Sequence, residues 1–149
     1  MAHGIRRAKP SDLPAIQELE LACFEEYRQA SAASLKRSLS SPHQSVWVID
    51  APDRKSLWSL LVLWHFPHRL RVYDVCTHPD ARGHGHGRDL MHHAEALARK
   101  AGCDWMTLEA EEQDPRLVGW YESQGYQVVD RLKDFYHKGC GAVRMTKRL

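Results

Sequence analysis

The chain has 149 residues, of which 43% are hydrophobic and 27% are charged. These shares are close to the averages of globular proteins and exclude disordered, fibrous and membrane classes, and the length suits one domain with its own core, residues 1–149. A formal net charge of +2 is too small for a dedicated nucleic-acid binder, so we expect no nucleic-acid and no membrane partner.

The opening segment MAHGIRRAKPSD has no apolar stretch of the kind found in secretion signals, so the expected location is cytoplasmic. The cysteines lie far apart in the sequence and form no CxxC pair. We therefore expect reduced, mostly buried thiols and neither a disulfide framework nor a cysteine metal site.

Hydrophobic periodicity predicts the elements of the first half. A short strand at 5–8 precedes a helix within 11–27, whose apolar stripe includes Ile16 and Leu19, and a shorter helix follows at 34–39. The apolar runs 45–49 and 56–66 are separated by DAPDRK, which has the composition of a hairpin turn. With a third strand at 69–77, they predict an antiparallel meander.

The second half opens with a glycine-rich loop and a helix that continues until Gly102. A strand follows at 103–110, and then a helix at 114–124 that Asp114 and Pro115 open and Gly125 ends. Two last strands, at 126–132 and 142–146, are joined by KDFYHKGCG. This order of elements predicts an α+β fold with helices packed on a mixed sheet.

The loop RGHGHGR, residues 82–88, alternates glycine with histidine at the start of a predicted helix. Backbone amides at a helix N-terminus lack intrahelical partners and carry the positive end of the helix dipole, which suits a phosphate. Glycines let that backbone approach a ligand closely, and Arg82 and Arg88 add positive charge at both lips. We expect a phosphate-binding loop, and a plain turn between strand and helix is the alternative.

Other ligands fit this loop less well. A P-loop needs a lysine after its last glycine, and none follows Gly87. A dinucleotide fingerprint needs a third glycine where Arg88 stands, although Glu109 lies about where the ribose-binding acid of that fold would be. Zinc needs three or four converging ligands, so we expect no metal on the histidines of this region, His84, His86, His92 and His93.

These residues together resemble a known family. The segment 77–103 is similar to the acetyl-CoA-binding motif of the GNAT superfamily of N-acetyltransferases, with matching positions at Arg82, Gly85 and Gly87. The segment 107–129 resembles the second half of that fold through Leu108, Glu109, Tyr121, Gly125 and Tyr126. The closing segment is similar to that of the branch that acetylates protein N-terminal amines, including the N-terminal alanine of a ribosomal protein, at Phe135, Tyr136, Gly139, Ala142 and Met145.

The resemblance implies a GNAT fold, in which a mixed, mostly antiparallel sheet has a splayed central pair of strands and helices cover both faces. It also implies acetyl-CoA as co-substrate, with its pyrophosphate on the amides of the glycine loop and its pantetheine along the preceding strand. The predicted cofactor-binding residues are Val75, Cys76, Thr77, Arg82, Gly83, His84, Gly85, His86, Gly87, Arg88 and Asp114.

Acetyl transfer to an amine needs a proton acceptor for the amine and a proton donor for the leaving thiolate. Glu109 is the candidate base, directly or through water, and a structural carboxylate paired with an arginine is the alternative. The resemblance makes Tyr121 the candidate acid, and a core tyrosine with a satisfied hydroxyl is the alternative. Direct transfer is favoured over an acetyl-cysteine intermediate on Cys76, because the motif holds no histidine matched to that thiol.

The amine acceptor is the least determined part of the prediction. We expect a protein or peptide amine, at an N-terminus or a lysine. A small-molecule amine, or a silent acyl-CoA-binding module that only binds a partner, are the alternatives, and a homodimer is a further expectation. The end of the strand predicted at 103–110 and the segment after it are acidic, with Glu109, Glu111, Glu112 and Asp114. If these side chains form the rim of the site, they favour a cationic acceptor, and side chains that are simply solvated are the alternative.

Overall fold

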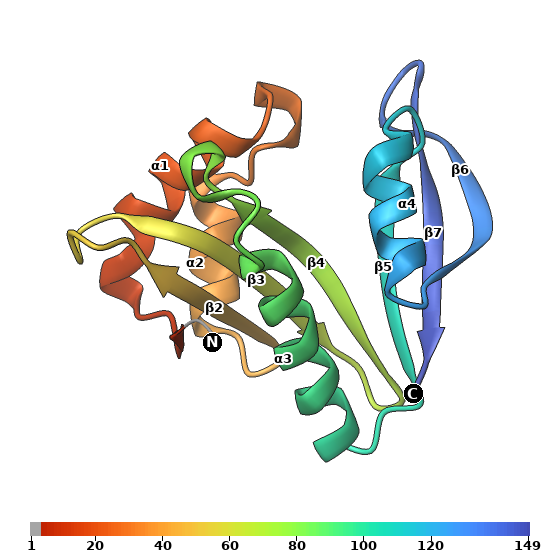
Figure 1. Cartoon of the computed structure of the whole chain (residues 1–149), viewed down its shortest axis with the longest axis horizontal. Coiled ribbons are helices and arrows are strands. Elements are labelled where there is room, and N and C mark those ends of the chain that lie inside the picture. The colour runs from red at the N-terminus through yellow and green to blue at the C-terminus, as the bar shows by residue number, and fades with distance from the viewer. Residues whose placement is uncertain (1–3) are drawn as a thin grey trace.

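The computed structural model describes residues 4–149, in which seven strands form one sheet in the order β1-β2-β3-β4-β5-β7-β6 (Figure 1). The strands are β1 (Ile5–Arg7), β2 (Gln44–Asp50), β3 (Leu57–His65), β4 (Arg69–Thr77), β5 (Trp105–Glu111), β6 (Gln127–His137) and β7 (Cys140–Arg148). The α-helices are α1 (Leu13–Cys23), α2 (Ala32–Ser40), α3 (His86–Lys100) and α4 (Pro115–Ser123). Short 3-10 turns are η1 (Pro10–Asp12), η2 (Glu26–Arg28) and η3 (Pro79–Ala81).

The central strands β4 and β5 are parallel and separate halfway along their length. Residues 69–72 pair with residues 105–108, and the pairing stops there although β4 continues to Thr77 and β5 to Glu111. A register shift between β3 and β4 leaves Tyr73 as an extra residue, which increases the local bend of β4. Figure 1 shows the two strands together near the C-terminus and diverging toward their other ends. The predicted mixed, mostly antiparallel sheet with a splayed central pair is confirmed.

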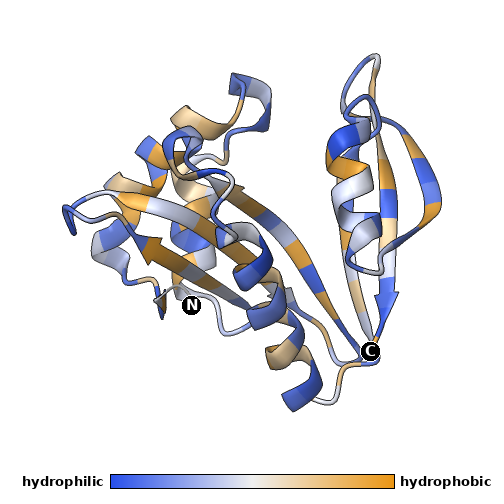
Figure 2. Ribbon diagram, viewed as in Figure 1, coloured by the Kyte–Doolittle hydropathy of each residue, from blue (hydrophilic) through white to orange (hydrophobic). Residues whose placement is uncertain are grey.

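Helices cover both faces of the sheet, as predicted. On one face, α1 and α2 bury Ile16, Leu19 and Leu35 against β2 and β3. On the other face, α3 buries Leu90 and Met91 against the central strands, and α4 packs on the same cluster. Figure 2 shows hydrophilic and hydrophobic stretches alternating along α3. Within residues 4–149, no helix is long and apolar enough to span a membrane.

Three boundaries differ from the prediction for local reasons. The first helix ends at Cys23 because Phe24 is extended, with φ −128° and ψ 147°. The second helix starts earlier than predicted because Ser31 caps it, its hydroxyl accepting a hydrogen bond from the amide of Ser34 at 3.1 Å. The segment 133–141, predicted as a connection, lies mostly in strands β6 and β7, which turn at Gly139 with φ 84°.

Candidate active site

A cavity of about 1260 Å³ opens where β4 and β5 diverge, and its walls come from the segment after α1, β4, the glycine loop, β5 and α4. Its volume is above the usual range for small-molecule and cofactor sites, about 300–1,000 Å³. The predicted cofactor-binding and catalytic residues all line this one cavity: Val75, Cys76, Thr77, Arg82, Gly83, His84, Gly85, His86, Gly87, Arg88, Glu109, Asp114 and Tyr121.

Each glycine of the loop 83–87 has its own structural reason. Gly83 and Gly85 have φ values of 85° and 83°, in the left-handed region that side chains rarely adopt. Gly85 is the N-cap of α3, so the loop leads directly to the unpaired amides of that helix. A Cβ on Gly87 would lie 3.3 Å from the indole ring of Trp120, so this glycine lets α3 and α4 approach closely. The loop is therefore shaped as a backbone cradle.

The side chains of the loop differ in exposure. Arg82 is tied to the end of β4, where its Nε donates a hydrogen bond to the carbonyl oxygen of Thr77 at 3.0 Å. His84 and Arg88 are exposed at the cavity, whereas His86 is only 7% exposed and its ring lies edge-on to that of His84, with 6.4 Å between the ring centroids. Of the two loop histidines, His84 is therefore the one that faces solvent.

Asp114 begins α4 on the opposite wall. Its carboxylate accepts a hydrogen bond from the amide of Leu117 at 3.1 Å, which confirms the predicted helix cap. The cap fixes the start of the helix that carries Tyr121 into the cavity. Thr77, at the end of β4, shares a hydrogen bond of 3.0 Å with the hydroxyl of Ser59 on β3.

Glu109 lies on β5 between two strands that each supply an arginine. Its side chain is 8% exposed, and its Oε1 lies 3.0 Å from a guanidinium nitrogen of Arg71 and 3.7 Å from one of Arg144. The arginine pairing that the sequence left as an alternative is therefore present. The carboxylate also lines the cavity, so the ion pairs fix its position in the cavity wall.

The ring of Tyr121 is packed in the hydrophobic core, but no hydrogen bond within the described residues holds its hydroxyl. It is 4% exposed and packs against Trp120 and Tyr126, with ring centroids 5.0 Å and 5.9 Å away. Burial and the nearby Asp74 raise the pKa of its phenol above the usual value. Among residues 4–149, no hydrogen-bond partner of the hydroxyl is found, and the side chain lines the cavity. A proton donor is thus available there.

The glutamates of the predicted acidic rim have arginine partners in the structure. Glu111 accepts a hydrogen bond from the hydroxyl of Tyr27 at 3.0 Å and forms an ion pair with Arg28 at 3.2 Å. Glu112 forms an ion pair with Arg131. With Glu109 also paired, each of these glutamates has an arginine partner, and Glu112 and Asp114 are exposed to solvent.

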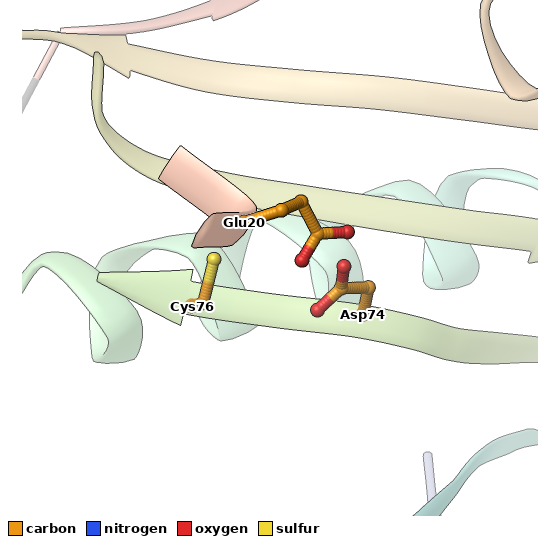
Figure 3. A group of neighbouring side chains, drawn as sticks. All are labelled: Glu20, Asp74 and Cys76. Carbon is orange, nitrogen blue, oxygen red and sulfur yellow. The ribbon is translucent and has the colours of Figure 1, made fainter. Parts of the chain in front are cut away.

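Sequence reasoning missed the wall formed by the end of α1 and the segment after it. Cys23, Arg28 and Asp74 line the cavity, and Glu20 lies behind Asp74. The carboxylates of Glu20 and Asp74 and the Sγ of Cys76 all lie within 4.8 Å of one another (Figure 3). The available signal was an acidic residue on the apolar stripe of α1 and another inside an apolar strand.

The thiol of Cys76 is held in its protonated form. The neighbouring thiol of Cys23 and burial together raise its pKa well above the usual value. A thiol that keeps its proton is a weak nucleophile, because the thiolate is the reactive form. Cys76 is therefore poorly suited to act as a nucleophile.

Comparison with known proteins agrees with this geometry. The sequence model of a family described as acetyltransferase (GNAT) family matches residues 13–126. An uncharacterized N-acetyltransferase of Bacillus subtilis (strain 168), YhfO, is 32% identical over 134 residues, which cover 83% of this chain and 89% of that protein.

Solved structures share the fold at low sequence identity. The ribosomal-protein-S18-alanine N-acetyltransferase of Escherichia coli superposes with a TM-score of 0.86 at 17% identity, covering 97% of this chain and 92% of that one. A chimera of the spermidine N-acetyltransferase SpeG from Vibrio cholerae and hSSAT superposes with a TM-score of 0.79 at 19% identity, covering 99% and 96%. At such identities the likeness establishes the fold alone.

Proposed function

The chain belongs to the acetyltransferase (GNAT) family and is an acyltransferase, and on that premise we propose that it moves an acetyl group from acetyl-CoA directly to a primary amine. One observation carries the proposal. A glycine cradle at the N-terminus of α3, the unpaired part of β4 and the hydroxyl of Tyr121 all border the same cavity. These are the parts needed to hold a pyrophosphate, an extended amide-containing arm and a leaving thiolate.

Acetyl-CoA is the proposed donor because its parts match the order of these features. The amides of residues 83–88, with Arg82 and Arg88 at the lips, would hold the pyrophosphate. Beyond Val72 the backbone of β4 has no strand partner on the side of β5, so Val75, Cys76 and Thr77 can pair with the amides of the pantetheine arm. The thioester would then lie between β4 and Tyr121, and no metal is needed for either contact.

The proposed chemistry is attack of a free amine on the thioester carbonyl. Glu109 is the proposed base, and because its carboxylate is held by Arg71 and Arg144, we expect it to act through a water molecule. Tyr121 is the proposed acid that protonates the CoA sulfur as the carbon–sulfur bond breaks. Holding donor and amine in one cavity supplies the orientation that the reaction needs.

We propose a protein or peptide amine, N-terminal or lysine, as the acceptor. The E. coli neighbour acts on the N-terminal alanine of a ribosomal protein by its name, and the SpeG chimera on spermidine. Because one fold serves both acceptors, a small-molecule amine is the alternative outcome of the test. In either case the acceptor would lie near the arginine-paired carboxylates of Glu109 and Glu111, which line the cavity.

The test is CoA release from acetyl-CoA with a panel of amines: N-terminal peptides, lysine peptides, polyamines and aminoglycosides. We expect turnover with one acceptor class, and Glu109→Gln should lower kcat at least about tenfold, or about 1.4 kcal/mol. Glu112→Gln is the matched control, since it removes an exposed rim carboxylate that also pairs with an arginine. Binding of acetyl-CoA without turnover of any amine would instead identify a binding module.

A second prediction concerns His84. If this exposed imidazole lies beside the pyrophosphate, the phosphate charge favours its protonated form, so CoA binds more tightly at low pH and the gain is lost as the histidine deprotonates. Calorimetric titration at about pH 6 and about pH 8 should show tighter binding at the lower pH. The difference should shrink in His84→Ala, and equal affinity of the wild type at both pH values would contradict the prediction.

A further inference from the structure

Two carboxyl groups face each other between α1 and β4. Glu20, in the last turn of α1, is 1% exposed, and Asp74 lies on β4 opposite Val62 of β3. Figure 3 shows the carboxylate of Glu20 directed from the helix toward that of Asp74, with Cys76 beside them on the same strand. Within residues 4–149, no ion pair with Glu20 or Asp74 is found.

Two carboxylates this close together, one buried and the other half-buried at the cavity wall, do not both carry a charge, because their repulsion and the desolvation of Glu20 are costly. Burial raises the pKa of Glu20, and burial together with Glu20 raises the pKa of Asp74 well above its usual range. The pair therefore shares one proton, and its two titration steps belong to both residues. At neutral pH the pair then holds one proton, and its remaining carboxylate can accept a second one.

The other charged and titratable groups around the pair do not replace that proton. Arg28, from the segment after α1, is the nearby cation, and its guanidinium is already paired with Glu111 at 3.2 Å. The thiols of Cys23 and Cys76 carry no positive charge. Tyr121 faces Asp74 from α4 as a neutral phenol. Arg82 lies near Cys23, where it contributes to lowering the pKa of that thiol.

The pair lies at the reacting end of the cavity. Asp74 lines the cavity and sits between the extra residue Tyr73 and Val75, where β4 has lost its pairing with β5. We propose that Asp74 is a proton acceptor for the amine in the acetyl transfer, and that Glu20 is a positioning residue that holds the shared proton. This inference rests on the proposed function and adds a second route for the proton beside the water-mediated route to Glu109.

Protons and bonds balance over the whole step. The ammonium group gives one proton to the carboxylate of Asp74, and the free amine forms a bond to the thioester carbon. The carbon–sulfur bond then breaks, and the departing sulfur takes the proton of Tyr121. The surplus proton of the amide nitrogen returns to the phenolate, and Asp74 releases its proton to solvent. One ammonium and one thioester thus become one amide, one thiol and one free proton.

Kinetics of Asp74→Asn and Glu20→Gln test the proposal, with Glu18→Gln as a control on the exposed face of the same helix. Asp74→Asn should lower kcat about 100-fold while leaving the KM for acetyl-CoA unchanged. Glu20→Gln removes the neighbour that raises the pKa of Asp74. The wild type should therefore show the two titration steps of the pair in the pH profile of kcat/KM and Glu20→Gln a single step, whereas a purely structural role of Glu20 would leave the profile unchanged.

An infrared measurement on the unliganded protein gives a readout without turnover. The wild type should show the carbonyl absorption of a protonated carboxyl group at neutral pH, and Glu20→Gln should lack it. Absence of that band in the wild type, or a metal ion found on the protein by elemental analysis and lost in Glu20→Gln, overturns the shared proton. Unchanged kcat in Asp74→Asn overturns the catalytic role. Failure of the wild type with every amine would instead contradict the proposed function.

Discussion

Replacing Tyr121 by phenylalanine is expected to slow acetyl transfer about 100-fold while leaving the affinity for acetyl-CoA almost unchanged. The hydroxyl has no partner among residues 4–149, and burial raises its pKa, so the phenol keeps its proton until a stronger demand arises. The leaving thiolate is the base that takes this proton. The amine nitrogen can return a proton to the phenolate in the same step, so no phenolate remains. Without the hydroxyl, the thiolate must leave unprotonated into a cavity of low dielectric.

Tyr126→Phe is the matched control for this variant. Tyr126 is 1% exposed and packs against Tyr121, but its hydroxyl donates a hydrogen bond of 3.0 Å to Glu95. Losing that buried hydrogen bond should lower the stability by about 1 kcal/mol or more without slowing turnover. Stopped-flow or steady-state CoA release measures both variants. A kcat of Tyr121→Phe within about twofold of the wild type would exclude the hydroxyl as the acid.

The glycine loop could be predicted from the sequence because its requirements are local. Gly83 and Gly85 take left-handed φ values that favour glycine wherever they occur, and the cap and helix that follow are read from adjacent residues. The same holds for Asp114, which caps α4 from the position directly before it. Such features depend on a few neighbouring residues, so the order of elements and the cradle were both within reach of sequence reasoning.

The partners of the site carboxylates could not be predicted in the same way. Glu109 meets Arg71 and Arg144 only because the sheet order places β5 between β4 and β7. Glu20 meets Asp74 only because α1 packs across β4, and the apolar neighbours of each acid in the sequence do not identify its partner. The segment 133–141 was predicted as a connection because its charged residues interrupt the alternation typical of a strand. The register between β6 and β7 is also irregular, so the pairing does not follow a simple two-residue period. These relations depend on tertiary packing, which residue spacing does not encode.

Substituting valine for Gly83 is expected to weaken CoA binding about 30-fold, which corresponds to about 2 kcal/mol. Gly83 has φ 85°, and nothing lies within 4 Å of the place that a Cβ would take, so the effect comes from the backbone rather than from a clash. A β-branched residue avoids this conformation, and the loop can relieve the strain only by turning its amides away from the cavity. The pyrophosphate would then lose the donors that the cradle holds in place.

Gly102→Val separates this effect from a general loss of stability. Gly102 follows the other end of α3, has φ 78°, and likewise has nothing within 4 Å of a Cβ. Both variants should lower the melting temperature by similar amounts, because the conformational cost is the same at both positions. Only Gly83→Val should weaken CoA binding in calorimetric titration. Equal affinities of the two variants would mean that the loop does not hold the pyrophosphate, and the donor would then have to bind through β4 and α4 alone.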